Sequence, residues 1–144
     1  MFSKACEYAI KASVYIAGQS ISKTLVTVKQ VANATDAPEP FTAKILQQLC
    51  RANLLESVRG KMGGFHFNDE QLDSIKIYDI VDLIDGSKIF TSCGLGLKEC
   101  SNANPCPVHE DFKIIRSKML EMCQKFSLRD LALKSNQGFF FLKV

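Results

Sequence analysis

The strongest structural signal in this 144-residue chain is the run Gln47-Gln-Leu-Cys-Arg-Ala-Asn-Leu-Leu-Glu-Ser-Val-Arg-Gly-Lys-Met-Gly-Gly-Phe65. Apolar and polar residues alternate over residues 54–58 and again over residues 64–67, which is typical of short β-strands. The glycines between these two runs permit a hairpin turn. Asn53 can adopt the left-handed conformation that ends a helix, so the run predicts a helix followed by a β-hairpin.

Three helices are expected before this hairpin. Residues 3–17 have apolar side chains at helical spacing, and residues 18–23 are expected to break that helix. Thr27 is a candidate N-cap for a helix over residues 28–34. A further helix starts near Pro38 or Pro40 and runs to about residue 52, with Phe41, Ile45, Leu46 and Leu49 on its inner face. This order predicts a mostly α fold with a small β-hairpin, a winged helix-turn-helix.

The rest of the chain predicts a connecting helix, a cysteine loop and a long C-terminal dimerisation helix. The connecting helix covers residues 77–84, the loop covers residues 87–105, and Pro107 is expected to open the long helix. That helix presents an apolar stripe at 3-4-3-4 spacing, which fits a dimer seam or packing on its own core. Because a winged helix needs no such helix for its own fold, the dimer seam is favoured. The stripe residues are Phe112, Ile115, Met119, Met122 and Phe126.

The expected division of the chain follows these elements. Residues 1–70 form the DNA-binding domain, residues 71–106 the connecting helix and loop, residues 107–134 the dimerisation helix and a short last helix, and residues 135–144 an apolar tail. A capping box at residues 127–130 starts the last helix. The apolar, β-prone sequence of the tail is consistent with either an added β-strand or a segment that fills a pocket.

Composition narrows the class of protein. The apolar fraction of 47% suffices for a core, and no apolar run reaches the ~20 residues of a membrane span. The N-terminus lacks a signal peptide, so a cytoplasmic protein without membrane contact is expected. The net charge of +3 is too small to prove a nucleic-acid partner. Of the six cysteines, Cys6, Cys50 and Cys123 are scattered on helices and predict small buried side chains.

The other three cysteines form the main candidate site. Cys93, Cys100, Cys106 and His109 follow the spacing C-x6-C-x5-C-x2-H in a loop rich in Gly, Asn, Ser and Pro. Thiolates bind soft metals and iron–sulfur clusters, and such a loop can wrap around an inorganic centre. The spacing is not that of a CxxC zinc knuckle, although a structural Cys3His zinc site stays an alternative. An enzyme with a Cys93 nucleophile is not expected, since no general base or phosphate-binding loop is near.

Candidate DNA contacts follow from the winged-helix order. Arg59, Gly60 and Lys61 lie in the expected wing, where arginine can enter a narrow minor groove or bind phosphate. Lys44 is the best groove-facing cation of the second helix. Phe41, Thr42 and Thr27 are further candidates for contact with a thymine methyl group or a phosphate.

The motif S-x-R-G-x-x-G-G-aromatic at residues 57–65 resembles the wing of the Rrf2 family of regulators, with its IscR-like, NsrR-like and CymR-like members. Residues 6–12 resemble the first helix of that family and residues 77–86 its connecting helix, and the likeness covers residues 2–134. The resemblance implies a homodimeric transcription factor, not an enzyme, whose long helices cross and whose winged helices bind a palindromic double-stranded operator.

The resemblance also implies an iron–sulfur cluster on Cys93, Cys100 and Cys106, which CymR-like members lack. His109 matches the fourth ligand of a 2Fe–2S site in IscR-like members and is favoured. Glu7 is its rival, because an acidic residue of the partner's first helix reaches a 4Fe–4S cluster in NsrR-like members. The first cysteine gap of six, where five is common, leaves the cluster type open. The alternative is a winged-helix regulator with zinc or no metal that responds to a small molecule or a partner protein.

Overall fold

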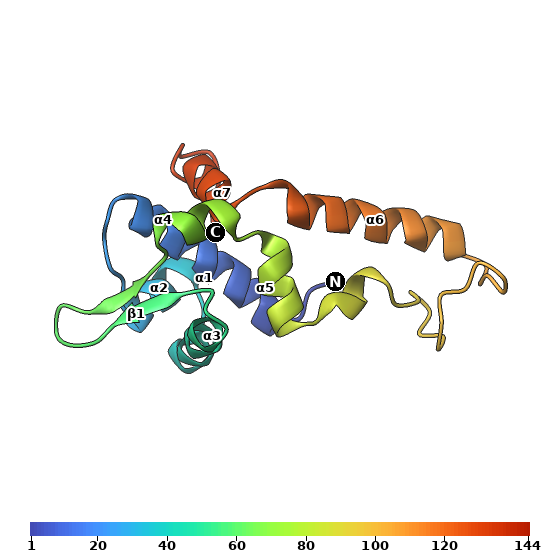
Figure 1. Cartoon of the computed structure of the whole chain (residues 1–144), viewed down its shortest axis with the longest axis horizontal. Helices are drawn as coiled ribbons and strands as arrows, with labels where there is room; N and C mark the ends of the chain where they lie inside the picture. Colours follow the sequence, from blue (N-terminus) through green and yellow to red (C-terminus); the bar gives the residue numbers. More distant parts are fainter.

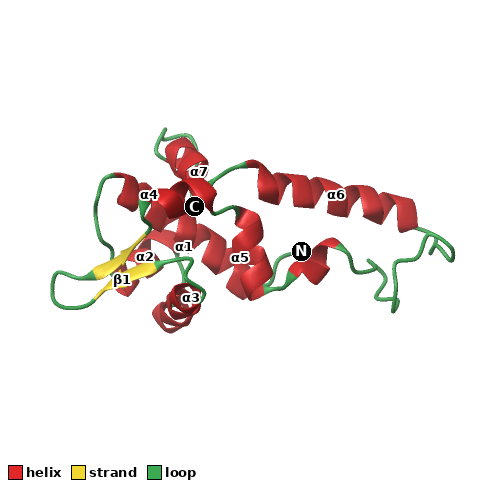
Figure 2. Ribbon diagram, in the orientation of Figure 1, coloured by secondary structure: helices red, strands yellow, loops and turns green.

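The structure, a computed structural model, describes residues 1–144 and is mostly helical with one two-stranded hairpin (Figures 1 and 2). No helix is both long enough and apolar enough to span a membrane. In chain order the elements are α1 (Lys4–Ile21), α2 (Val28–Thr35), α3 (Glu39–Arg51), β1 (Glu56–Val58), β2 (Gly64–His66), α4 (Asp69–Ser74), α5 (Ile77–Ile84), the 3-10 helix η1 (Ser87–Phe90), α6 (His109–Lys125) and α7 (Leu128–Ser135).

Local sequence signals place α2 and α3 as expected. The Thr27 hydroxyl accepts a hydrogen bond from the Gln30 amide, and the Gln30 side chain accepts one from the Thr27 amide, which completes a capping box. Pro40 lies in the first turn of α3, where its missing N–H removes no helical hydrogen bond. Asn53 has φ of 58° and reverses the chain after α3. The helix-turn-helix prediction is therefore confirmed.

The hairpin has the expected strands, although each has only three residues. Ser57 lies opposite Phe65 in an antiparallel register, and Phe65 also forms a bridge with Val26, in the segment before α2. A Cβ atom at Gly63 would lie 2.0 Å from the Val58 carbonyl oxygen, and one at Gly64 would lie 2.6 Å from that of Val26. These approaches require glycine at both positions and explain the Gly-Gly pair of the wing motif.

One hydrophobic core joins the helix-turn-helix to the last helix. Ile16 of α1, Leu46 of α3, Ile80 of α5 and Leu128 of α7 are all at most 1% exposed and belong to one cluster. The core of the DNA-binding part therefore extends beyond residue 70, and α7 packs back onto it along α1.

Three details differ from the sequence predictions. α1 continues through Gly18 to Ile21, because Gly18 is buried at a helix contact where a Cβ would meet the Asn136 side chain at 3.4 Å. α4 was not predicted, although Asn68 and Gln71 form its capping box. α6 begins at His109, two residues after Pro107, which lies in the preceding turn.

The long helix α6 projects from the core, so that the wing and the cysteine loop lie at opposite ends of the molecule (Figure 1). A second, smaller cluster of Cys6, Val81, Phe90 and Cys123 connects α1, α5, η1 and α6. Cys6 and Cys123 are 0% exposed, which confirms their predicted role as small buried residues; Cys50 is half-buried.

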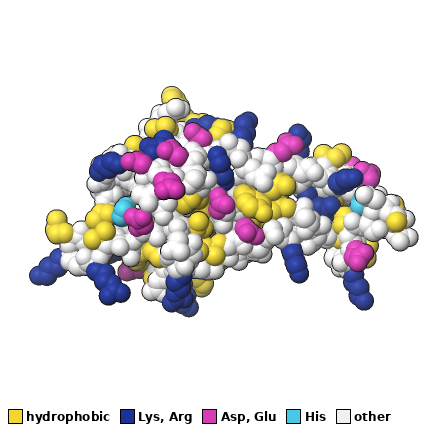
Figure 3. All heavy atoms as spheres, in the orientation of Figure 1, with side chains coloured by type: hydrophobic (Ala, Val, Ile, Leu, Met, Phe, Trp, Pro, Cys, Tyr) yellow, Lys and Arg dark blue, Asp and Glu magenta, His cyan; other side chains and the backbone are white.

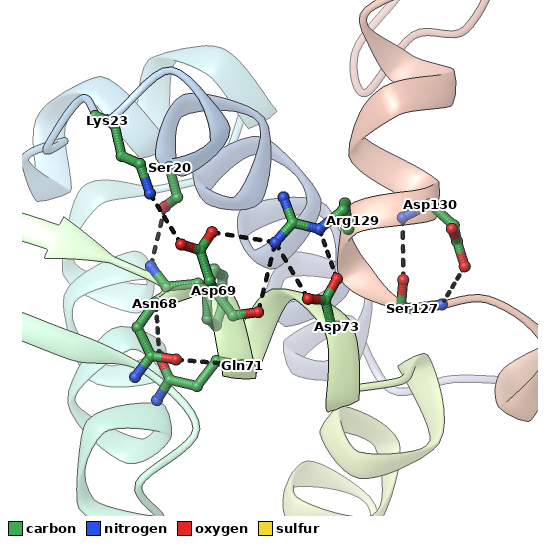
Figure 4. A network of polar contacts seen from close by, with 10 residues as sticks. Ser20, Lys23, Asn68, Asp69, Gln71, Asp73, Ser127, Arg129 and Asp130 are labelled. Carbon is green, nitrogen blue, oxygen red and sulfur yellow. Dashed lines mark hydrogen bonds and ion pairs between the residues drawn. The ribbon is translucent and has the colours of Figure 1, made fainter.

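A polar network fixes α7 against the base of the wing (Figure 4). The Arg129 guanidinium donates to Asp73 Oδ1 at 2.5 Å and to Asp69 Oδ1 at 3.1 Å. Lys23 also bonds Asp69, at 3.2 Å, and the predicted Ser127–Asp130 capping box starts α7. This network therefore joins α7, α4 and the turn after α1.

The apolar tail adds no strand to the hairpin. It turns back toward α1 and α7, where Phe140, Phe141 and Leu142 line a hollow together with Ile10 and Val14. The ammonium group of Lys143 donates to the Asn33 carbonyl at 2.9 Å.

Candidate functional site

The residues expected to contact DNA divide into exposed and buried groups. Lys44, Arg59 and Lys61 are exposed on α3 and the wing turn, and basic side chains project from this end of the molecule (Figure 3). Gly60 is also exposed, with φ of 105°, and a Cβ there would meet nothing within 4 Å. Thr27 is exposed, while its hydroxyl caps α2.

Two assignments on α3 are corrected by the structure. Phe41, expected on the inner face, is 57% exposed and points outward, where it can contact DNA. Thr42 is 2% exposed, and its hydroxyl donates to the Pro38 carbonyl at 3.0 Å. The start of α3 is thus rotated by one residue relative to the prediction, and Thr42 supports the helix instead of facing a groove.

The cysteine loop places Cys100 against His109 at the start of α6. The Cys100 sulfur lies 3.3 Å from His109 Nδ1, and His109 is 4% exposed. Cys93 has the Cys106 side chain and the backbone N–H groups of Leu95 and Leu97 as neighbours that favour its thiolate. No three His, Cys, Asp or Glu side chains converge on one point as ligands of a single metal ion.

The surroundings of Cys93 favour its thiolate. The two backbone N–H groups, first that of Leu95, hold the pKa of Cys93 below its usual value, and the Arg116 charge acts in the same direction. A sulfur that accepts backbone N–H bonds in a glycine-containing loop is suited to bind a cluster or a soft metal. The donor set therefore fits an iron–sulfur cluster in its chemistry.

His109 begins α6 and is oriented by a second side chain. Its Nε2 lies 2.8 Å from the Asn102 side-chain oxygen, which accepts a hydrogen bond when Nε2 carries the proton. Nδ1 then presents its lone pair to Cys100 and to any metal bound there. Asn102 was not identified from the sequence, since loop asparagines usually signal a turn.

Glu7, the rival ligand, lies on α1 and its side chain is 45% exposed. The Lys4 ammonium group lies 2.9 Å from its carboxylate and holds the pKa of Glu7 below its usual value. Within one chain this carboxylate is bound to Lys4, so a role at the cluster would require the loop of a second subunit.

The apolar stripe of α6 has two sets of residues. Ile115 and Met122 are 56% and 45% exposed, and neighbouring Ile114 is 59% exposed. Met119 instead packs on the smaller core cluster, and the ring of Phe112 lies against Gly94. Phe126 is in extended backbone after the helix, with the Lys134 ammonium 3.6 Å from its ring centroid, so the helical stripe ends at Met122.

Comparison with known proteins identifies relatives along nearly the whole chain. The family model Rrf2, described as an iron-dependent transcriptional regulator, matches residues 2–134. A protein of Aquifex aeolicus described as an HTH-type transcriptional regulator is 32% identical over 133 residues, which are 91% of this chain and 90% of that protein. The regulator IscR of Vibrio atlanticus is 25% identical over 130 residues, covering 90% of this chain and 73% of its own.

Solved structures have the same fold. The global cysteine regulator CymR of B. subtilis superposes with a TM-score of 0.76 at 22% identity, covering 93% of this chain and 97% of its own. IscR of T. potens superposes with a TM-score of 0.73 at 21% identity, covering 97% and 91%. With its winged helix, its long projecting helix and a family match over residues 2–134, this chain belongs to the Rrf2 family of DNA-binding transcriptional regulators, which are not enzymes.

Proposed function

We propose that this regulator binds a palindromic operator as a homodimer and senses redox state, iron–sulfur supply or nitric oxide through an iron–sulfur cluster. Cys93, Cys100, Cys106 and His109 would hold the cluster. The observation that carries this proposal is the buried His109 at the start of α6, whose Nδ1 lies 3.3 Å from the Cys100 sulfur in the loop that also holds Cys93 and Cys106.

The donor set favours a two-iron cluster over a single zinc ion. The spacing C-x6-C-x5-C-x2-H is not that of a CxxC zinc knuckle, and a loop of this length can wrap around a larger inorganic centre. A 2Fe–2S cluster takes four protein ligands, which Cys93, Cys100, Cys106 and His109 would supply. A 4Fe–4S cluster with Glu7 of a second subunit is the alternative.

When bound, the cluster would supply a redox-sensitive and nitric-oxide-sensitive centre. The chain's own residues connect this centre to α6: His109 is the first residue of the helix and bonds both Cys100 and Asn102. Since these contacts and Phe112 against Gly94 help to hold the first turn of α6, release of His109 is expected to fray it.

A dimer would cover the exposed apolar residues of α6. Three apolar residues of α6 belong to neither core cluster and are about half exposed to solvent: Ile114, Ile115 and Met122. Packing two such helices together removes this surface from water and sets the spacing between the two wings. Two wings related by a two-fold axis would read two half-sites of a palindrome.

The cluster proposal is tested by purifying the protein without oxygen and measuring iron, acid-labile sulfide and visible absorption. We expect a coloured protein with two irons and two sulfides per chain, and Cys100→Ser should lose both. Cys50→Ser is the matched control, because Cys50 lies on α3 outside the loop. Zinc at one ion per chain without sulfide would refute the cluster proposal.

The fourth ligand is distinguished by two further variants. His109→Ala should change the visible spectrum and weaken cluster retention, whereas Glu7→Ala should leave both unchanged. The opposite result would assign the fourth position to Glu7. DNA binding by the protein with and without its cluster, measured on one operator, then tests the sensing role.

A further inference from the structure

We infer that Arg116 is a positioning residue for the cysteine loop, which it ties to α6, and that it supplies the fixed positive charge beside the thiolates. The positioning role stands on contacts within the chain alone. The charge role rests on the proposed cluster.

The guanidinium group of Arg116 bonds the loop at two points. Nη1 donates to the Ser92 carbonyl oxygen at 2.7 Å, directly before Cys93, and Nη2 donates to the Cys100 sulfur at 3.1 Å. A planar guanidinium with two divergent N–H groups can make both bonds at once, which a lysine ammonium group on a flexible stem does less well. Arg116 thereby holds the start of the loop and its middle on one helix.

His109 and Arg116 act on the same sulfur from the same helix. They are seven residues apart, which is about two helical turns, so both side chains lie on one face of α6. His109 Nδ1 is 3.3 Å from Cys100 Sγ and Arg116 Nη2 is 3.1 Å from it. Cys100 is consequently the loop residue whose position depends most directly on α6.

Arginine is also suited to this place when the sulfur is a ligand. A guanidinium has no lone pair to offer a metal and stays protonated, so it donates to a thiolate without replacing it. Three thiolates on one cluster leave the site negatively charged, and Arg116 is half-buried beside them. Hydrogen bonds and positive charge near cluster sulfurs favour the reduced form.

Lys113 provides a matched control. It lines the same hollow as Arg116, Cys100 and His109, but it is exposed and makes no hydrogen bond or ion pair with the loop. Replacing Lys113 by glutamine therefore removes one nearby positive charge without disturbing how the loop is held. Arg116→Lys keeps the charge and loses the two-point geometry, while Arg116→Gln loses both.

The positioning role is tested by amide hydrogen exchange on the full-length protein without metal. Arg116→Gln should raise exchange over residues 92–105 by about tenfold, since a hydrogen bond from a charged donor is removed. Arg116→Lys should give a smaller increase and Lys113→Gln none, with α1–α5 unchanged in all three. Unchanged loop exchange in Arg116→Gln would overturn the positioning role, and this arm is informative even if the protein binds no cluster.

The charge role is tested by the reduction potential of the cluster-containing protein. Arg116→Gln should have a more negative potential than the natural protein, and Arg116→Lys should restore most of the difference. A potential unaffected by Arg116→Gln would overturn the charge role. A protein that takes up no iron or sulfide refutes the proposed function and the charge role together, while loop exchange still decides the positioning role.

Discussion

Gly94→Ala tests whether the cysteine loop is packed against α6. A Cβ at residue 94 would lie 2.4, 2.4 and 2.5 Å from three ring atoms of Phe112, where ordinary contact begins at 3.4 Å. The ring must therefore move by about 1 Å. Overpacking of this kind costs about 1–3 kcal/mol, and a half-exposed ring that can swing aside gives a value near the lower limit. About 1 kcal/mol raises the population of the undocked loop roughly fivefold.

A double-mutant cycle isolates this contact. Gly94→Ala, Phe112→Ala and the combined variant are compared by amide hydrogen exchange over residues 92–105, without metal. We expect Gly94→Ala to cost about 1 kcal/mol in the natural background and close to nothing beside Phe112→Ala, a coupling of about 1 kcal/mol. Leu95→Ala is the control, because that side chain is 56% exposed. If the effects of the two substitutions are additive, the Phe112 ring does not pack on Gly94. Phe112 would then be assigned to the dimer seam, as the spacing of the stripe predicts.

Three further predictions concern the DNA-binding half and the smaller core. Arg59→Ala should weaken operator binding and reduce the salt slope of log Kobs by about 0.9 for each phosphate that the variant no longer neutralises, whereas an unchanged slope would exclude a phosphate contact. Thr27→Ala should lower the free energy of unfolding by about 1 kcal/mol in urea, because it removes the α2 cap, and Thr27→Ser should restore it. Burial, with Asp85 as a second cause, raises the pKa of Cys6 from 9.0 to about 12. The Cys6 thiol therefore binds its proton more tightly in the folded state than in the unfolded state. The resulting contribution to the free energy of unfolding is fully present below pH 9 and is lost as the pH rises toward 12. Urea midpoints should fall over that range in the natural protein and less in Cys6→Ala; parallel pH profiles would contradict this.

The helix-turn-helix and the wing could be predicted because each depends on local signals. The capping box at Thr27, the left-handed Asn53 and the glycines of the wing act within a few residues of their position. Gly18 shows where such signals fail. It is a helix breaker by propensity, yet α1 continues through it, because its contact with Asn136 comes from the far end of the chain.

At the candidate site the residue types were predictable, while their partners were not. The spacing of Cys93, Cys100, Cys106 and His109 identified the donor set. Arg116 and Asn102 carry no motif. Asn102 lies in the loop and meets His109 through its side-chain oxygen, whereas Arg116 reaches the loop because α6 runs back along it. The spacing of apolar residues likewise predicts only that Phe112 belongs to the apolar stripe. It does not predict that the Phe112 ring lies against Gly94 of the loop.

The position of the loop restricts how a change there could reach the wing. The two lie at opposite ends of the molecule (Figure 1), so direct contact between them within one chain is excluded. One connection runs along α6 into α7, which Arg129 fixes to α4 below the wing. The other runs through η1, where the Phe90 ring stacks on Tyr78 of α5 at 5.5 Å.

These two connections meet in the smaller core cluster, because Cys123 belongs to α6 and packs there with Cys6 and Val81. Close packing makes this cluster resistant to small shifts. The start of α6 lies beyond the cluster and is held by the contacts of His109 and Arg116 with the loop. The junction between α6 and α7 is fixed by the Leu128 amide, which donates to the Ile75 carbonyl at 2.9 Å. A dimer would place both α6 helices in its interface. Movement at the start of α6 would then alter the crossing of the two helices, and with it the distance between the two wings, without unfolding either winged helix.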